Sequence, residues 1–225
     1  MYQFITGPLL WLSLGIFSIG CIAHVALYIK NLDARLDRVA YDTCIASGLK
    51  GALRSIVLWL TPFGTRCWRQ NPVHTLLFYL FHVGAVAVPL FVSAHGILLK
   101  YRWGISIPAM PDAVADALTV GVLIGAAGLL IRRMVLPEVR QLTRPRDIGV
   151  LFLSVAPFAT AFMAYHQIGD VTFWTLAHIL SGELFLVAVP FTKLSHIVLF
   201  FCSRIQLGMD FSIKRGGLKA PGFPW

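Results

Sequence analysis

The chain has 225 residues, of which 57% are hydrophobic and only 13% are charged, and its mean hydropathy is +0.75. One small water-soluble core cannot bury that much apolar surface, so the composition excludes an ordinary soluble domain. Basic residues outnumber acidic ones and give a formal net charge of +9. No nucleic acid is needed to explain this charge, because the basic residues cluster in loops beside apolar stretches.

The apolar stretches are long enough to cross roughly 30 Å of hydrocarbon as helices. They are continuously apolar, whereas the strands of a membrane barrel alternate between apolar and polar residues. The sequence therefore predicts an all-α, five-transmembrane-helix bundle that forms a single membrane domain, 1–225. The expected spans are 8–29, 73–99, 113–131, 148–166 and 171–201.

The positions of Lys and Arg predict the orientation of these spans, because cytoplasmic loops are enriched in both. Seven basic residues lie from Lys30 to Arg69, five lie from Arg132 to Arg146, and four more follow the last span. We expect these loops and the C-terminus in the cytoplasm of a bacterium, with the N-terminus outside its inner membrane. Anionic lipid headgroups are the expected partners of the basic loops.

Two segments outside the spans also have expected roles. Within the cytoplasmic loop 30–72, the stretch 51–62 is too short to cross and contains Arg54, which favours an interfacial helix. Residues 204–225 are expected to form a cytoplasmic arm for a partner surface. The cysteines lack the spacings typical of iron–sulfur, zinc or covalent haem sites, so we expect free thiols.

Seven histidines in so apolar a chain point to a function, since imidazole is costly in hydrocarbon unless it is paired, hydrated or metal-bound. The second span carries His82 and His95, and the antiparallel fifth span carries His178 and His196. His82 is expected at the depth of His196, and His95 at the depth of His178. Each pair could clamp one haem iron from both faces.

The spacing of these histidines supports one pair better than the other. From His178 to His196 there are 18 residues, or five helical turns and roughly 27 Å, so one continuous helix would point both rings the same way. The offset of 13 positions from His82 to His95 leaves their directions roughly 140° apart. A kink at Pro89 could turn His95 back toward the interior, and His74 is the alternative ligand.

The residues alone leave a bis-histidine haem site, a haem-free proton path and a substrate cavity open. Lys193, one turn before His196, is a candidate partner for a haem propionate or a lipid headgroup. Glu183, deep in the fifth span, is either functional or held by a structural hydrogen bond. His24 and His166 have no partner at a matching depth, so we expect structural roles for them.

Three sequence blocks carry a resemblance to a known family: 80–84 (LFHVG), 132–140 (RRMVLPEVR) and 190–196 (PFTKLSH). With these blocks the chain resembles the γ-subunit family of respiratory nitrate reductase, which are five-span membrane cytochromes b. The resemblance implies two haem b groups. It assigns His82 and His196 to the cytoplasmic-side iron and His178, with His95, to the periplasmic-side iron.

The chain departs from that family in the second span, where His95 follows His82 at a longer spacing, as though a few residues had been inserted around Pro89. A longer spacing of this kind resembles the cytochrome b subunits of transmembrane electron-transfer complexes in sulfate-reducing bacteria, such as the high-molecular-weight cytochrome c complex. That branch implies other membrane subunits, a periplasmic multihaem cytochrome c and a cytoplasmic iron–sulfur protein as partners.

The expected function is therefore that of a di-haem subunit that carries electrons across the membrane, with the chemistry of the complex on other subunits. One alternative is a quinone-reactive subunit such as a nitrate reductase γ chain, with menaquinone as a further cofactor. The second is a haem-free transporter or scaffold that uses its histidines as a proton relay.

Overall fold

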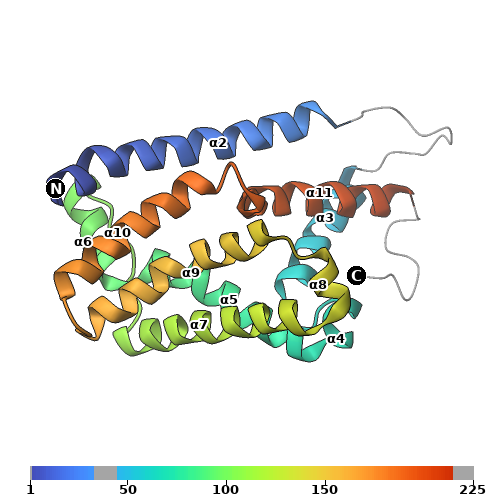
Figure 1. Ribbon diagram of the computed structural model, residues 1–225. Coiled ribbons are helices and arrows are strands. Elements are labelled where there is room, and N and C mark those ends of the chain that lie inside the picture. Colours follow the sequence, from blue (N-terminus) through green and yellow to red (C-terminus); the bar gives the residue numbers. More distant parts are fainter. Residues whose placement is uncertain (1, 33–44, 215–225) are drawn as a thin grey trace. The chain divides into compact units, whose positions relative to one another are not determined.

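The computed structural model describes residues 2–32 and 45–214, and every regular element in them is a helix (Figure 1). This confirms the all-α class for the described residues. The expected loop residues 33–44, with Cys44, and the end of the expected arm, 215–225, lie outside them. In chain order the elements are α1 (Tyr2–Phe4), η1 (Ile5–Leu9), α2 (Leu10–Lys30), α3 (Ile45–Leu60), α4 (Arg66–Gln70), α5 (Pro72–Phe91), α6 (Ser93–Trp103), α7 (Asp112–Val135), α8 (Pro137–Leu142), α9 (Pro145–Tyr165), α10 (Val171–Ala188), η2 (Lys193–Ser195) and α11 (His196–Lys214).

Five helices of the described residues are long and apolar enough to cross a membrane, as the sequence predicts. They are Tyr2–Lys30, Pro72–Phe91, Asp112–Val135, Pro145–Tyr165 and Val171–Ala188. The chain is thus a multi-pass membrane protein. The loop between the first two spans contains the expected helix, α3, although it begins at Ile45, and α11 extends through the first part of the expected C-terminal arm.

The second expected span, 73–99, is not one helix. Helix α5 ends at Phe91, Val92 adopts an extended conformation with ψ of 137°, and α6 starts afresh at Ser93. Pro89 lies in the last turn of α5, where its ring and missing N–H weaken the helix. The predicted irregularity near Pro89 is present, and it takes the form of a complete break.

The fifth expected span, 171–201, is also interrupted, so the prediction of one continuous helix from His178 to His196 is wrong. Helix α10 ends at Ala188, and α11 begins only at His196 after a turn and the short helix η2. Pro190 lies in this gap, and the Thr192 side chain accepts a hydrogen bond from Leu194 N at 3.2 Å. A proline followed by a side chain that competes for backbone donors explains the break.

The chain divides into two compact units. Unit 1 contains residues 1–10 and 76–185, and unit 2 contains residues 11–75 and 186–225. The single membrane domain expected from the sequence stays a prediction, and each unit is described below by itself.

The core of unit 1 lies where α5, α7 and α9 pack, around Phe81, Val122, Ala126 and Phe158. Close approach depends on glycine: a Cβ on Gly125 would lie 2.9 Å from Phe81 N, inside the contact limit. Small residues let helix backbones approach in this way, which membrane helices use in place of hydrophobic driving force.

Unit 2 is built on the pairing of α3 with α11 (Figure 1). A Cβ on Gly208 of α11 would lie 2.5 Å from the carbonyl oxygen of Gly51 and 2.6 Å from the Cα of Ala52. The face of α3 that includes Gly51 and Ala52 is buried, whereas Leu49, Leu53 and Val57 are exposed.

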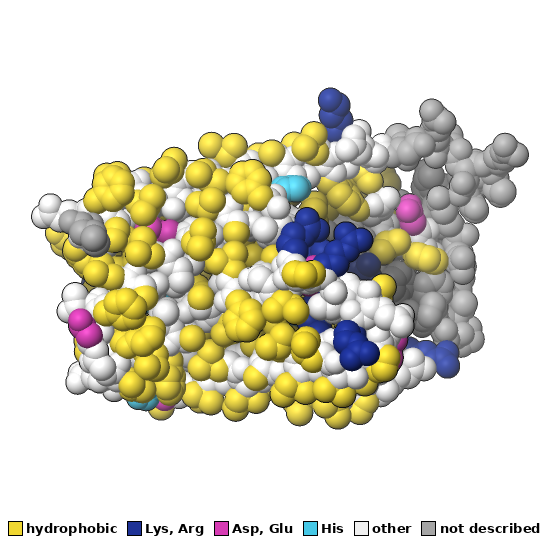
Figure 2. Space-filling view, viewed as in Figure 1, with side chains coloured by type: hydrophobic (Ala, Val, Ile, Leu, Met, Phe, Trp, Pro, Cys, Tyr) yellow, Lys and Arg dark blue, Asp and Glu magenta, His cyan; other side chains and the backbone are white. Residues whose placement is uncertain are grey.

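Large apolar side chains are exposed over both units, with Ile19 at 71% and Ile97 at 70% of their full accessibility. In Figure 2 hydrophobic side chains cover most of the visible face, while Lys and Arg gather around α8. Exposed apolar side chains of this extent are expected where lipid is the solvent.

Candidate functional site

Unit 1 brings two of the predicted ligands together. The rings of His95, from α6, and His178, from α10, have centroids 6.0 Å apart, and their planes differ by 19°. Two imidazoles on opposite faces of a metal ion, with bonds of about 2 Å, have ring centroids roughly 6 Å apart. The spacing of His95 and His178 therefore suits a shared iron.

Both rings of this pair are held by the same kind of hydrogen bond. His95 Nδ1 donates to the carbonyl oxygen of Pro89 at 2.9 Å, and His178 Nδ1 donates to that of Pro157 at 2.8 Å. Because a carbonyl only accepts, each Nδ1 carries the proton and each Nε2 keeps its lone pair. Neither Nε2 is hydrogen-bonded to any described residue. This arrangement is typical of metal-ligating histidines.

The other two predicted ligands also donate a hydrogen bond from Nδ1 to a backbone carbonyl. His82 Nδ1 donates to the carbonyl oxygen of Phe78 at 2.8 Å, and His196 Nδ1 donates to that of Lys193 at 2.8 Å. The His82 ring also stacks on Phe78, with centroids 3.9 Å apart. His82 belongs to unit 1 and His196 to unit 2, so their pairing stays a prediction.

His24 and His166 are bound differently, through Nε2. His24 Nε2 donates to the carbonyl oxygen of Pro190 at 2.6 Å, beside the gap between α10 and α11, and His166 Nε2 donates to Asp116 Oδ1 at 2.8 Å. The nitrogen that most often binds a metal is thus used for structure in both. His74, the alternative ligand, belongs to unit 2, where its ring lies 6.1 Å from that of Trp68.

The remaining candidates fall in different places. Lys193 is the first residue of η2, and Glu183 is 4% exposed with neither carboxyl oxygen hydrogen-bonded to a described residue. Cys21, Cys67 and Cys202 are free. No three His, Cys, Asp or Glu side chains of residues 2–32 and 45–214 converge as a metal site, and a bis-histidine haem needs only two ligands.

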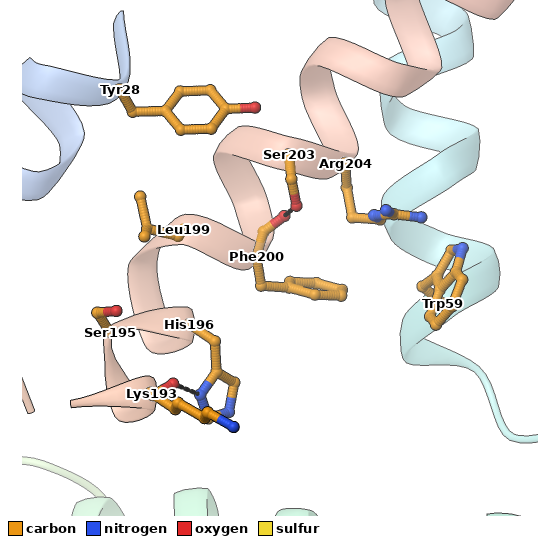
Figure 3. Close-up of a pocket in the computed structure, with 9 residues that line it drawn as sticks. All are labelled: Tyr28, Trp59, Lys193, Ser195, His196, Leu199, Phe200, Ser203 and Arg204. Carbon is orange, nitrogen blue, oxygen red and sulfur yellow. Dashed lines mark hydrogen bonds between the residues drawn. The ribbon is translucent and has the colours of Figure 1, made fainter. Parts of the chain in front are cut away.

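Sequence reasoning missed a cavity in unit 2, shown in Figure 3, which is lined by His196 and Lys193 together with Arg204 and Trp59. Arg204 appeared only as one of the basic residues after the last span. No sequence pattern links it to Trp59, because the two residues meet through the packing of α3 on α11.

The fold defines a multi-pass α-helical membrane protein in which the histidine pair lies on two interrupted spans. No protein-family model matches the chain. It is 56% identical to a protein of Nitratidesulfovibrio vulgaris (strain Hildenborough) over 226 aligned positions, which cover all of both chains. The chain therefore belongs to the same family as this relative, whose name, "Protein", gives no activity.

Proposed function

We propose that this protein is a di-haem, b-type cytochrome subunit of an oxidoreductase complex in a bacterial inner membrane. It carries electrons between a periplasmic cytochrome c and a cytoplasmic iron–sulfur protein. The observation that carries the proposal is the state of the four candidate histidines. All four donate Nδ1–H to a backbone carbonyl, and the ring centroids of His95 and His178 lie 6.0 Å apart.

In this proposal His95 and His178 hold the periplasmic-side haem, His82 and His196 hold the cytoplasmic-side haem, and Lys193 neutralises a propionate. Bound haem supplies one-electron redox chemistry. The backbone carbonyls fix the tautomer and orientation of each ring and raise the basicity of its Nε2. Held by two histidines, each haem would transfer electrons and would not bind oxygen or a substrate.

The protein also controls how much water reaches the candidate sites. Phe78 and Phe81 pack against the ring of His82, with centroids 3.9 and 5.1 Å away. An apolar surrounding of this kind limits solvent access, and so tunes the reduction potential of a bound haem.

Orientation completes the proposal. The basic residues of the loops favour a cytoplasmic side that carries α8 and the loop containing α3, with the N-terminus outside. The cytoplasmic iron–sulfur partner then meets the basic side, and the periplasmic cytochrome c meets the opposite one.

Haem quantitation tests the proposal. Purified protein is expected to show a b-type reduced-minus-oxidised spectrum with two haems per chain. His178→Ala and His196→Ala are each expected to lose one haem, and the double variant both. His24→Ala, a histidine bound through Nε2, serves as the matched control and should retain both. A preparation with no b-type spectrum, or a double variant that keeps both haems, contradicts the proposal.

A further inference from the structure

The cavity of unit 2 has a volume of about 430 Å³ and opens beside His196 (Figure 3). This volume falls within the range of small-molecule and cofactor sites. Its walls come from α2, α3, η2 and α11, all within unit 2. A ligand in it would therefore lie against the same helix that presents His196.

Two cations line the cavity, and none of the described residues that line it is Asp or Glu. Lys193 comes three residues before His196, and its backbone carbonyl accepts the Nδ1 hydrogen bond of that ring. Arg204 comes eight residues after His196, about 12 Å further along α11. The cavity thus carries positive charge on both sides of the imidazole along the chain.

Arg204 is held in place by an aromatic ring. Its guanidinium carbon lies 4.6 Å from the ring centroid of Trp59 on α3. Partial burial lowers the pKa of Arg204, and the neighbouring Tyr28 acts in the opposite direction. No carboxylate among the described residues forms a salt bridge with Arg204. A partly desolvated cation of this kind gains from an anionic ligand.

The rest of the lining suits a flat apolar body. Leu199, Phe200 and the Trp59 ring form the apolar wall. The hydroxyl of Tyr28 donates to the side-chain oxygen of Gln206, so this potential ligand group is already engaged within the protein. The cavity therefore combines an apolar wall with two cations and an imidazole.

We infer that this cavity receives the carboxylate edge of a haem bound by His196, with Arg204 as a positioning residue that pairs with one propionate. Lys193 is the partner of the other. A haem is a flat apolar ring with two carboxylates, which would match an apolar wall, two cations and an imidazole. The inference rests on the proposed function and adds Arg204, held by Trp59, to it.

An anionic phospholipid also joins negatively charged oxygens to an apolar body. The haem is favoured as the occupant because His196 lines the same cavity as Arg204. A lipid would use both cations without any need for the imidazole between them.

The test uses the full-length His178→Ala protein, in which a single haem remains for redox titration. In this background Arg204→Gln is expected to lower the reduction potential of the remaining haem, because the lost positive charge had opposed the ferric form. Arg204→Lys keeps the charge and should restore most of the potential. Trp59→Leu keeps Arg204 but removes its support, and should give a smaller shift in the same direction.

Arg54→Gln is the matched control, because Arg54 is an exposed cation of α3 that does not line the cavity. It should leave the potential unchanged. Equal potentials for Arg204→Gln, Trp59→Leu and the parent overturn the inference while haem quantitation still upholds the proposed function. An unchanged potential with loss of co-purified phosphatidylglycerol or cardiolipin in native mass spectrometry also overturns it, in favour of a lipid site. A wild-type protein without haem refutes both.

Discussion

The two units present their candidate histidines in different ways. In unit 1, His95 and His178 meet across two helices, and backbone carbonyls of Pro89 and Pro157 hold their Nδ1 atoms. In unit 2, His196 stands at the first turn of α11 beside a cavity with two cations. Unit 1 therefore contains both histidines of one candidate pair, whereas unit 2 contains one candidate ligand beside a charged pocket.

Under the proposed function, this contrast separates two tasks in binding a haem. The candidate ligands hold the iron, and the charged pocket orients the macrocycle and sets its potential. Variants of the candidate histidines in either unit should thus change haem content, and variants of Arg204 or Trp59 should mainly change potential.

The largest expected effect is a change in haem content, which tests whether His95 or His74 is the ligand. His95→Ala is expected to remove one of the two haems, because it deletes half of the pair with ring centroids 6.0 Å apart. His74→Ala, a histidine of unit 2 next to Trp68, should keep both. Pyridine-haemochrome quantitation against protein concentration measures the difference. Haem loss in the His74 variant alone would reverse the assignment.

A variant that disturbs the packing of unit 2 should lower the stability of that unit, whereas a matched variant in unit 1 should not. Gly208→Ala places a Cβ 2.5 Å from the carbonyl oxygen of Gly51, and backbone cannot yield cheaply, so unit 2 should lose about 3 kcal/mol. In a chain of this size that corresponds to a Tm lower by roughly 6–12 °C. Haem loss on heating should begin at the His196 site. Gly182→Ala, in unit 1 with nothing within 4 Å of its Cβ, is the control, and an equal Tm for both variants contradicts the expectation.

A smaller effect on stability is expected in unit 1 from replacing the buried side chain of Glu183. The side chain is 4% exposed and neither carboxyl oxygen is hydrogen-bonded to a described residue, which is an energetic cost. Glu183→Met, of similar length, is expected to raise stability by about 1–3 kcal/mol, or the Tm by roughly 2–12 °C. Both haems should remain. A destabilised variant would mean that the carboxyl group has a favourable structural role.

The smallest expected effect concerns a histidine that is not a candidate ligand. His166 and Asp116 share a hydrogen bond between side chains that are 35% and 34% exposed, so solvent screens most of its energy. His166→Asn should change stability by less than about 1 kcal/mol and leave haem content and potentials unaltered. Thermal unfolding combined with a redox titration checks both. A lost haem would place His166 in a site and weaken the contrast between Nδ1-bound and Nε2-bound histidines.

Much of the fold was predictable because it follows from apolar length. The five spans could be drawn from composition alone, since nothing but a helix satisfies its own backbone in lipid. The breaks were harder to foresee. Pro89 was recognised as a disturbance, but 171–201 was predicted as one span despite Lys193, and the break at Pro190 was not foreseen.

The sequence predicted that His95 lies near His178, but it did not predict the groups that hold these side chains in place. Depth arguments predicted His95 beside His178. The argument from helical phase between His178 and His196 was wrong, because α10 and α11 are separate helices. The carbonyl acceptors of Pro89 and Pro157, and the stacking of Arg204 on Trp59, come from tertiary packing, which single-sequence patterns do not encode.

The break at Val92 has a consequence for how this family can vary. Because α6 starts as a new helix at Ser93, its own contacts set the direction in which its side chains point. That direction no longer depends on the number of residues in α5. Residues gained or lost in the link need not rotate His95 away from His178. The longer spacing from His82 to His95, by which the sequence departs from the family that it resembles, is therefore a change that such a joint can absorb while His95 stays beside His178.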